Sequence, residues 1–243
     1  MLEFCIKPFD MNYASQTLAA IVSNHYQTAP LFEKFNLDFC CKGKQTLALA
    51  CEQKGLDLNT VVQELEELVN DNPGKNIPFA DMEAAQLIQY ILIHHHFFVK
   101  QTVPQILGYL EKINAKHGDR FPQMSRVLNL FRQLSFELLS HMEKEEQVLF
   151  PAINALEKDP SVAIKFKAVI EQMLAEHHEA GDLMDQIRVL TLNYTPPEDT
   201  CTTFQLTLTM LKDFEANLHK HVHLENNHLF PIVTKQIELS EYQ

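Results

Sequence analysis

The sequence has few glycines and no long apolar run, and both absences restrict the possible folds. Six glycines in 243 residues, together with the lack of alternating Val/Ile/Thr-rich segments, argue against a β-sheet. No stretch approaches 18 consecutive apolar residues, and the first ten residues, MLEFCIKPFD, lack the unbroken apolar run of a signal peptide. No Gly-x-Gly-x-x-Gly fingerprint for a flavin or nicotinamide occurs. We therefore expect a nearly all-helical protein that is soluble and cytoplasmic.

Positive charge is also scarce, and the cysteines do not form an obvious set of pairs. Twenty Lys and Arg face 32 Asp and Glu, and the formal net charge of −12 argues against binding to nucleic acid or to an anionic membrane. The five cysteines are an odd number, and the adjacent Cys40 and Cys41 could bridge each other only under strain. We expect no disulfide scaffold, and we interpret Cys5, Cys51 and Cys201 as structural residues.

A segment rich in proline and asparagine divides the chain. NDNPGKNIPF, from Asn70 to Phe79, contains two prolines, one glycine and three asparagines, which is typical of a linker. We predict a small helical N-terminal domain at residues 1–70, a linker at 71–79 and a larger domain at 80–243. Apolar spacing in the small domain predicts four helices, the last of them capped by Asn59. These helices cover Tyr13–Asn24, Ala29–Phe35, Gln45–Gln53 and Asn59–Asn70.

The larger domain contains four long stretches with helical periodicity. Turn signals such as HGDRFP, EKDPS and NYTPPED separate them. Short connections between long helices predict an up-down-up-down bundle, a fold that builds metal sites in its interior. Pro104 predicts a kink or a break after Thr102. The predicted helices cover Asp81–His117, Pro122–Leu156, Ser161–Leu192 and Glu198–Leu239.

Two segments of the bundle repeat one pattern, 80 residues apart. HMEKEEQVLFP begins at His141 and HVHLENNHLFP begins at His221, and both read His-x-x-x-Glu-x-x-x-Leu-Phe-Pro. Residues four apart lie about 40° apart around a helix, so His141 shares a face with Glu145, and His221 shares one with Glu225. A single pair of this kind is usually an exposed contact worth a few tenths of a kcal/mol. Two copies at matching positions indicate instead that both pairs point into the bundle.

One further histidine precedes each pair at a similar distance. His96 lies 45 residues before His141, and His177 lies 44 residues before His221. Imidazoles and carboxylates without a thiolate suit iron, manganese or zinc. These donors are fewer than the positions around two octahedral ions, so some positions stay open to exogenous molecules. The sequence therefore predicts one metal centre built from His96, His141, Glu145, His177, His221 and Glu225.

This constellation resembles the hemerythrin-like di-iron bundles and, more closely, the Repair of Iron Centers family of ScdA-type proteins. DFCCKGKQTLALA resembles the family's N-terminal signature, and HMEKEEQVLFP, EHHEAGDLM, TPPEDTCTTF and HVHLENNHLFP match the family in order and spacing. The resemblance covers nearly the whole chain. It implies an all-α fold in which a small helical N-terminal domain precedes a hemerythrin-like up-down four-helix bundle. It also implies two iron ions per chain, oxo- or hydroxo-bridged, with the six predicted residues as four histidine ligands and two bridging glutamates.

Several histidines beside the predicted ligands compete for the same role. Adjacent residues differ by about 100° around a helix, so at most one histidine of ILIHHHFF can face the metals. The spacing between the halves favours His96 and leaves His94 and His95 to the polar face or to hydrogen bonds with a ligand. His177 is favoured over His178 because AEHHEAGDLM follows the arrangement of the family. We expect three further histidines to face solvent, namely His219, His223 and His228.

The residues around the ligand glutamates have less specific predictions. Glu143 and Glu146 are interpreted as solvated surface residues, and a role in tuning the site stays open for either. The two Leu-Phe pairs are expected in the core at the end of the bundle. Pro151 and Pro231, which follow them, are expected to bend or tighten their helices.

The cysteine pair of DFCCKGK has both a structural and a chemical interpretation. A cysteine in a small helical domain is often simply a small buried apolar residue. Lys42 and Lys44 lie beside Cys40 and Cys41, however, and nearby cations lower the pKa of a thiol. We therefore favour a redox, iron-handling or partner-docking role for the pair.

Three functional hypotheses follow. The resemblance implies a stress-response protein that repairs iron–sulfur clusters damaged by nitric oxide or oxidants, with damaged iron–sulfur proteins as partners and its own iron as a possible source. A second hypothesis is a di-iron nitric oxide or peroxide reductase, which would need an external electron donor. A third is a module that senses or stores oxygen or iron, although four histidines in register, rather than five, argue against a reversible oxygen carrier. A homodimer is possible in each case.

Overall fold

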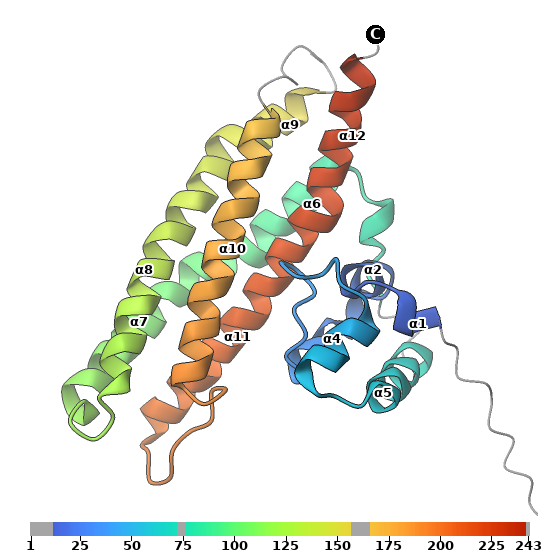
Figure 1. Cartoon of the computed structure of the whole chain (residues 1–243). Coiled ribbons are helices and arrows are strands. Elements are labelled where there is room, and N and C mark those ends of the chain that lie inside the picture. The colour runs from blue at the N-terminus through green and yellow to red at the C-terminus, as the bar shows by residue number, and fades with distance from the viewer. Residues whose placement is uncertain (1–11, 72–75, 157–165, 242–243) are drawn as a thin grey trace, which may run out of the picture. The chain divides into compact units, whose positions relative to one another are not determined.

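The structure, a computed structural model, is built from helices. It describes residues 12–71, 76–156 and 166–241, and within these ranges it contains no β-strand, only an isolated bridge between Thr17 and Thr46. The chain separates into two compact units, Met1–Asp81 and Met82–Gln243 (Figure 1). Every helix in the described ranges is too short or too polar to cross a membrane. The all-helical fold expected from the sequence is confirmed.

Four long helical stretches form the second unit. The first comprises α6 (Ala84–Ile91), a π-helical turn η3 (Leu92–His96) and α7 (Phe97–His117), and the second comprises α8 (Gln123–Lys144), a π-helical turn η4 (Glu145–Leu149) and α9 (Phe150–Leu156). The third is α10 (Phe166–Leu190). The fourth comprises α11 (Thr202–Leu224), a π-helical turn η6 (Glu225–Leu229) and α12 (Phe230–Glu241).

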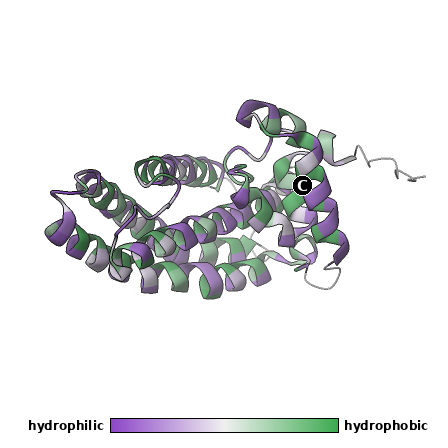
Figure 2. Cartoon of the chain, turned by 90° about the horizontal axis from the view of Figure 1, so that it is seen from below, coloured by the Kyte–Doolittle hydropathy of each residue, from purple (hydrophilic) through white to green (hydrophobic). Residues whose placement is uncertain are grey.

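The long helices close into a ring. α7 packs against α8 and α11, and α10 packs against the same two helices, which is the up-down-up-down arrangement expected for a four-helix bundle (Figure 1). Apolar and polar residues alternate around each helix (Figure 2), so one face of each can be buried against its neighbours. The large side chains of Phe131, Phe204 and Phe214 are fully buried.

The helices depart from regular geometry at other places than the sequence predicts. α7 continues through Pro104, so the alternative of a break after Thr102 is wrong. The widened turns precede Phe97, Phe150 and Phe230 instead, and in each the phenylalanine N–H donates to the carbonyl five residues earlier. Pro151 and Pro231 each follow one of these phenylalanines, so the helix before them is widened rather than tightened. The Leu-Phe pairs are buried as expected.

The first unit contains short helices with side-chain caps. These are α1 (Asn12–Ser15), α2 (Leu18–Asn24), α3 (Ala29–Lys34), α4 (Leu47–Lys54) and α5 (Leu58–Asp71). Thr17 and Thr46 cap α2 and α4. Asp57, rather than Asn59, accepts hydrogen bonds at the start of α5, because the helix begins one residue earlier than predicted. Part of the predicted linker packs on this unit, since Asn76 accepts from the Tyr26 N–H and donates to the Asn24 carbonyl.

DFCCKGK forms a tight loop of the first unit. The Asp38 carboxylate accepts hydrogen bonds from the backbone N–H groups of Cys40 and Cys41 at 3.0 and 2.9 Å. A Cβ on Gly43 would lie 2.2 Å from the Phe39 carbonyl oxygen, so only glycine fits at that position. The loop therefore fixes the backbone of the cysteine pair.

Candidate metal centre

The six predicted ligands come together in the interior of the bundle. His96 ends η3, His141 lies in the last turn of α8, Glu145 begins η4, His177 lies in α10, His221 lies near the end of α11 and Glu225 begins η6. All six are buried, and the two glutamates and His221 have no exposed area. They form two groups of possible metal ligands that share both glutamates, with ligand atoms within 4.8 Å of one another in each group. The first group adds His96 and His221, and the second adds His141 and His177.

Each glutamate divides its two oxygens between the two groups. Glu145 places Oε2 3.3 Å from His96 Nε2 and Oε1 3.2 Å from His141 Nε2. Glu225 places Oε1 3.0 Å from His221 Nε2 and Oε2 3.0 Å from His177 Nε2. One carboxylate therefore faces a histidine of each group at once, which is the arrangement that a carboxylate bridging two cations requires.

Within the part of the chain that the structure describes, several buried polar atoms of the six residues have no hydrogen-bond partner, and two histidine nitrogens face each other at short distance. Both oxygens of Glu145, Oε2 of Glu225 and Nε2 of His96 are buried and have no hydrogen-bond partner among the described residues. His141 Nε2 and His177 Nε2 lie 3.1 Å apart, while Nδ1 of each ring already contacts an oxygen acceptor. If both rings are neutral, the Nδ1 proton leaves a lone pair on each Nε2, and the two facing lone pairs repel unless a proton or a metal ion lies between them. These donors fit a metal ion.

The outer nitrogens of three histidines are held by residues on neighbouring helices. His96 Nδ1 lies 2.7 Å from Glu146 Oε1, and His141 Nδ1 lies 2.7 Å from Glu176 Oε2. His177 Nδ1 lies 2.9 Å from Asn226 Oδ1. Such contacts fix the ring orientation and make a histidine a better ligand. Glu146 therefore contacts a candidate ligand rather than only solvent. The histidine–glutamate repeat did not predict the contacts of Glu176 and Asn226.

Lysines donate hydrogen bonds to Glu146 and Glu176, the two carboxylates that contact histidine Nδ1 atoms. Lys100 Nζ donates to both oxygens of Glu146 at 2.7 and 2.8 Å, and Lys144 Nζ donates to Glu176 at 2.6 Å. Burial alone would raise the pKa of Glu176, but the hydrogen bonds from Lys144 and His141 outweigh it and lower the pKa to about 2. Glu176 therefore remains a carboxylate and accepts a hydrogen bond from His141 Nδ1–H.

The two buried carboxylates carry negative charge that nearby positive charge must balance. Burial raises the pKa of both glutamates, and the charge of Glu225 raises that of Glu145 further, but the surrounding histidines outweigh these effects and the net pKa of each glutamate is lowered. Burial opposes a charge on His141, yet the carboxylates raise its pKa to about 9. Two ionised carboxylates in a buried site need protons or metal ions beside them, and metal ions bind by displacing those protons.

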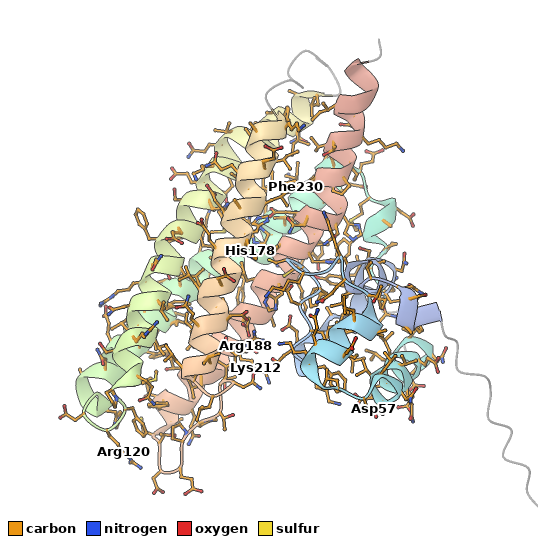
Figure 3. The ribbon with its side chains drawn as sticks, in the orientation of Figure 1. Asp57, Arg120, His178, Arg188, Lys212 and Phe230 are labelled. Atoms are coloured by element: carbon orange, nitrogen blue, oxygen red, sulfur yellow. The ribbon has the colours of Figure 1, made fainter. Side chains whose placement is uncertain are left out.

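The other histidines lie outside the two groups. His94 is exposed, while His95 is buried with its ring stacked at 5.6 Å on His221. His178, on α10 (Figure 3), has an exposed side chain that lies 3.9 Å from Asp182, so His177 is the inward residue of that pair. The expectation that His223 and His228 face solvent is wrong, because both are buried. α11 and η6 contact α6 as well as their bundle neighbours, so a position off the inward stripe is still covered.

A cavity reaches the centre from between α8, α10 and α11. It has a volume of about 220 Å³, and His141, His177 and His221 line it. Phe136, Lys144 and Glu176 are also among its lining residues. Small molecules can therefore approach three of the six candidate ligands.

The cysteine pair forms a separate cluster in the first unit. Cys40 Sγ lies 3.2 Å from Asp38 Oδ1 and 3.8 Å from Cys41 Sγ, and these three residues form a third group of possible metal ligands. The expectation of a lowered thiol pKa is wrong for Cys40. The hydrogen bond with Cys41, burial and the charge of Asp38 all raise the Cys40 pKa well above its usual value. Of the cysteines interpreted as structural, Cys51 is buried, Cys201 is exposed, and Cys5 lies outside the described residues.

The fold is that of a hemerythrin-like helical bundle, and the six inward residues form a candidate cation site. The hemerythrin HHE cation-binding domain model matches residues 87–233, which include all six. ScdA_N, a domain of unknown function, matches residues 14–69, which include the cysteine pair.

Whole-length relatives give a narrower assignment. The chain is 33% identical over 213 residues to the iron-sulfur cluster repair protein ScdA of Staphylococcus haemolyticus, covering 88% of this chain and 95% of the relative. It is 34% identical over 221 residues to the iron-sulfur cluster repair protein YtfE of Shigella boydii, covering 91% and 97%. The YtfE protein of Escherichia coli O1:K1 is 33% identical over the same length. The chain belongs to the ScdA and YtfE family.

Proposed function

We propose that this chain is a di-iron protein that repairs iron–sulfur clusters damaged by nitrosative or oxidative stress, and that it does so by donating iron. The observation that carries the proposal is the division of Glu145 and Glu225 oxygens between two histidine pairs. Two bridging carboxylates hold two ions close together, as carboxylates do in other metal-binding helical bundles. The relatives named as iron-sulfur cluster repair proteins support the choice of function.

Iron is the metal that best accounts for the donor set. Histidine nitrogens and carboxylate oxygens suit iron, manganese and zinc, but a structural zinc site is usually closed by four ligands around one ion. Here the two groups share Glu145 and Glu225, so neither group is a separate closed site around one ion. Bound iron would supply redox chemistry and an exchangeable ion, while the protein orients the ligands and limits access through the cavity.

The partners follow from this proposal. Damaged iron–sulfur proteins would receive the iron, and an external donor would supply electrons wherever the iron must be reduced before release. Asp38, Cys40 and Cys41 offer softer ligands in the first unit, where they could handle iron or contact a client protein. A homodimer would be compatible with these roles.

The experiment measures metal content and iron transfer together. Protein purified without oxygen should hold about two irons per chain, and mixing it with a nitric-oxide-damaged iron–sulfur enzyme should restore that enzyme while the protein loses iron. Restoration of the client with no iron lost would contradict donation. Consumption of nitric oxide or peroxide with iron retained would favour the reductase hypothesis, for which the cavity beside His141 and His177 is the supporting feature.

A matched pair of variants makes the result specific to the centre. Glu225→Gln keeps the shape of the side chain but removes a charge that faces both histidine pairs, whereas His178→Gln changes an exposed residue on α10. Only Glu225→Gln should lose iron and transfer. Equal transfer by both variants would exclude the bundle centre as the source of iron.

A further inference from the structure

The four candidate histidine ligands differ in what holds their outer nitrogen. Nδ1 of His96 and of His141 each contact a carboxylate, and Nδ1 of His177 contacts an amide oxygen. Nδ1 of His221 is buried and has no hydrogen-bond partner among the residues that the structure describes. The candidate centre is therefore asymmetric, although the sequence repeat that builds it is nearly symmetric.

The two candidate metal positions differ in how many of their histidines have an Nδ1 contact. The inner position, defined here by His141 and His177, has two histidines whose outer nitrogens are held. The outer position, defined here by His96 and His221, has only one. Both positions share the same two glutamates, so the Nδ1 contacts of the histidines are a difference that the glutamates do not offset.

The hydrogen bonds of His221 suit the metal-free state better than the metal-bound state. To bind a metal through Nε2, its ring must carry the proton on Nδ1, where the buried N–H would find no acceptor. Without metal, the proton can sit on Nε2 and form a 3.0 Å hydrogen bond to Glu225 Oε1. An unsatisfied buried N–H is unfavourable, so metal binding at the outer position carries a cost that the inner position avoids.

We propose that the outer position binds its ion more weakly than the inner position and that donated iron leaves from the outer position. The part of this inference that concerns the release of donated iron rests on the proposed function. Outer contacts of metal-bound histidines typically change metal affinity about 10- to 100-fold. The two positions should differ by about this factor.

The test uses cobalt(II) as a spectroscopic probe in the full-length, metal-free protein. Titration should give two steps whose dissociation constants differ about 10- to 100-fold. Glu146→Ala removes the contact to His96 Nδ1, and the two dissociation constants should then differ by more. Asn226→Ala removes the contact to His177 Nδ1, and the two constants should then differ by less. Two equal steps, or the opposite response of these variants, would overturn the inference.

Two ligand variants identify which position fills first. His221→Ala should retain the visible spectrum of the first cobalt equivalent, and His177→Ala should lose it. Circular dichroism checks that each variant keeps its helices, and a first-equivalent spectrum that survives in His177→Ala but not in His221→Ala would reverse the order of the positions. A protein that binds no second ion would refute the proposed function, whereas two ions bound equally would refute only the asymmetry.

Discussion

The buried histidines should make the metal-free protein less stable as pH rises. Burial opposes a charge on His141, but Glu145, Glu225 and Glu176 outweigh burial and raise its pKa from 6.5 to about 9. Burial likewise opposes a charge on His96, and Glu145 together with Glu225 raises the pKa of that residue. In the folded, metal-free state these histidines therefore hold protons that the unfolded chain releases.

The sign and size of the effect follow from this difference in bound protons. A histidine with a raised pKa stabilises the fold fully below about pH 6.5, and that stabilisation is lost as the pH rises toward 9. The rise in the pKa of His141 from 6.5 to about 9 corresponds to roughly 3 kcal/mol, since one pKa unit is about 1.36 kcal/mol. For a chain of this size, that loss is a fall of ~6–12 °C in melting temperature. Burial lowers the pKa values of His95 and His221, so both are neutral in the folded and unfolded states above about pH 7.5 and add no slope there.

Hydrogen exchange measured by mass spectrometry reports the stability of the bundle independently of the first unit. Peptides from α8 report the free energy of opening in the bundle, once the intrinsic exchange rate at each pH is taken into account. With a chelator present, this free energy should fall between pH 6.5 and 8.5, and iron-loaded protein should lack the fall because metals replace the protons. His178→Gln, at an exposed position, should behave like the unaltered protein. Constant or rising stability of the metal-free bundle over this range would refute the reasoning.

Two further predictions concern the glutamates and the cysteines. Glu145→Gln should lose the coupled pair of irons, because one oxygen faces each histidine group, and Mössbauer spectra that still show two coupled irons would contradict a bridging role. Cys40 should react with iodoacetamide more slowly than Cys201 at pH 7.5, since hydrogen bonding to Cys41, burial and the Asp38 charge raise the Cys40 pKa whereas Cys201 is exposed. Equal labelling rates in a mass spectrum would disprove this second expectation.

The sequence predicts the placement of the inward residues because helical periodicity fixes the relative direction of side chains four residues apart. His141 with Glu145 and His221 with Glu225 meet this condition within one turn. His96 and His177 come from separate helices, and only their matching distances from the repeat connect them with it. Their role as metal ligands remains a prediction, although all six residues converge in the bundle.

The residues around the centre could not be predicted in the same way. Glu176 and Asn226 each lie directly beside a candidate ligand in sequence, so about 100° of rotation points them away from the centre and toward a neighbouring helix. Which histidine each one contacts depends on the packing of two helices, as in the contact of Glu176 with His141 across α8 and α10. Single-sequence periodicity contains no information on that packing, and for the same reason it placed His223 and His228 in solvent.

The repeated Leu-Phe-Pro belongs to the same structural unit as the His-x-x-x-Glu before it. In a regular α-helix, the ring of Pro151 would clash with the carbonyl four residues earlier and leave it without a donor. In the structure, the π-helical turn begins at Glu145, and the Phe150 N–H bonds to the Glu145 carbonyl, so the backbone is already widened where the proline follows. Phe230 and Glu225 repeat this arrangement before Pro231. Widened turns of this kind often occur at functional sites. Here η4 and η6 each begin with a candidate ligand glutamate, and each is followed by a buried phenylalanine as the helix continues.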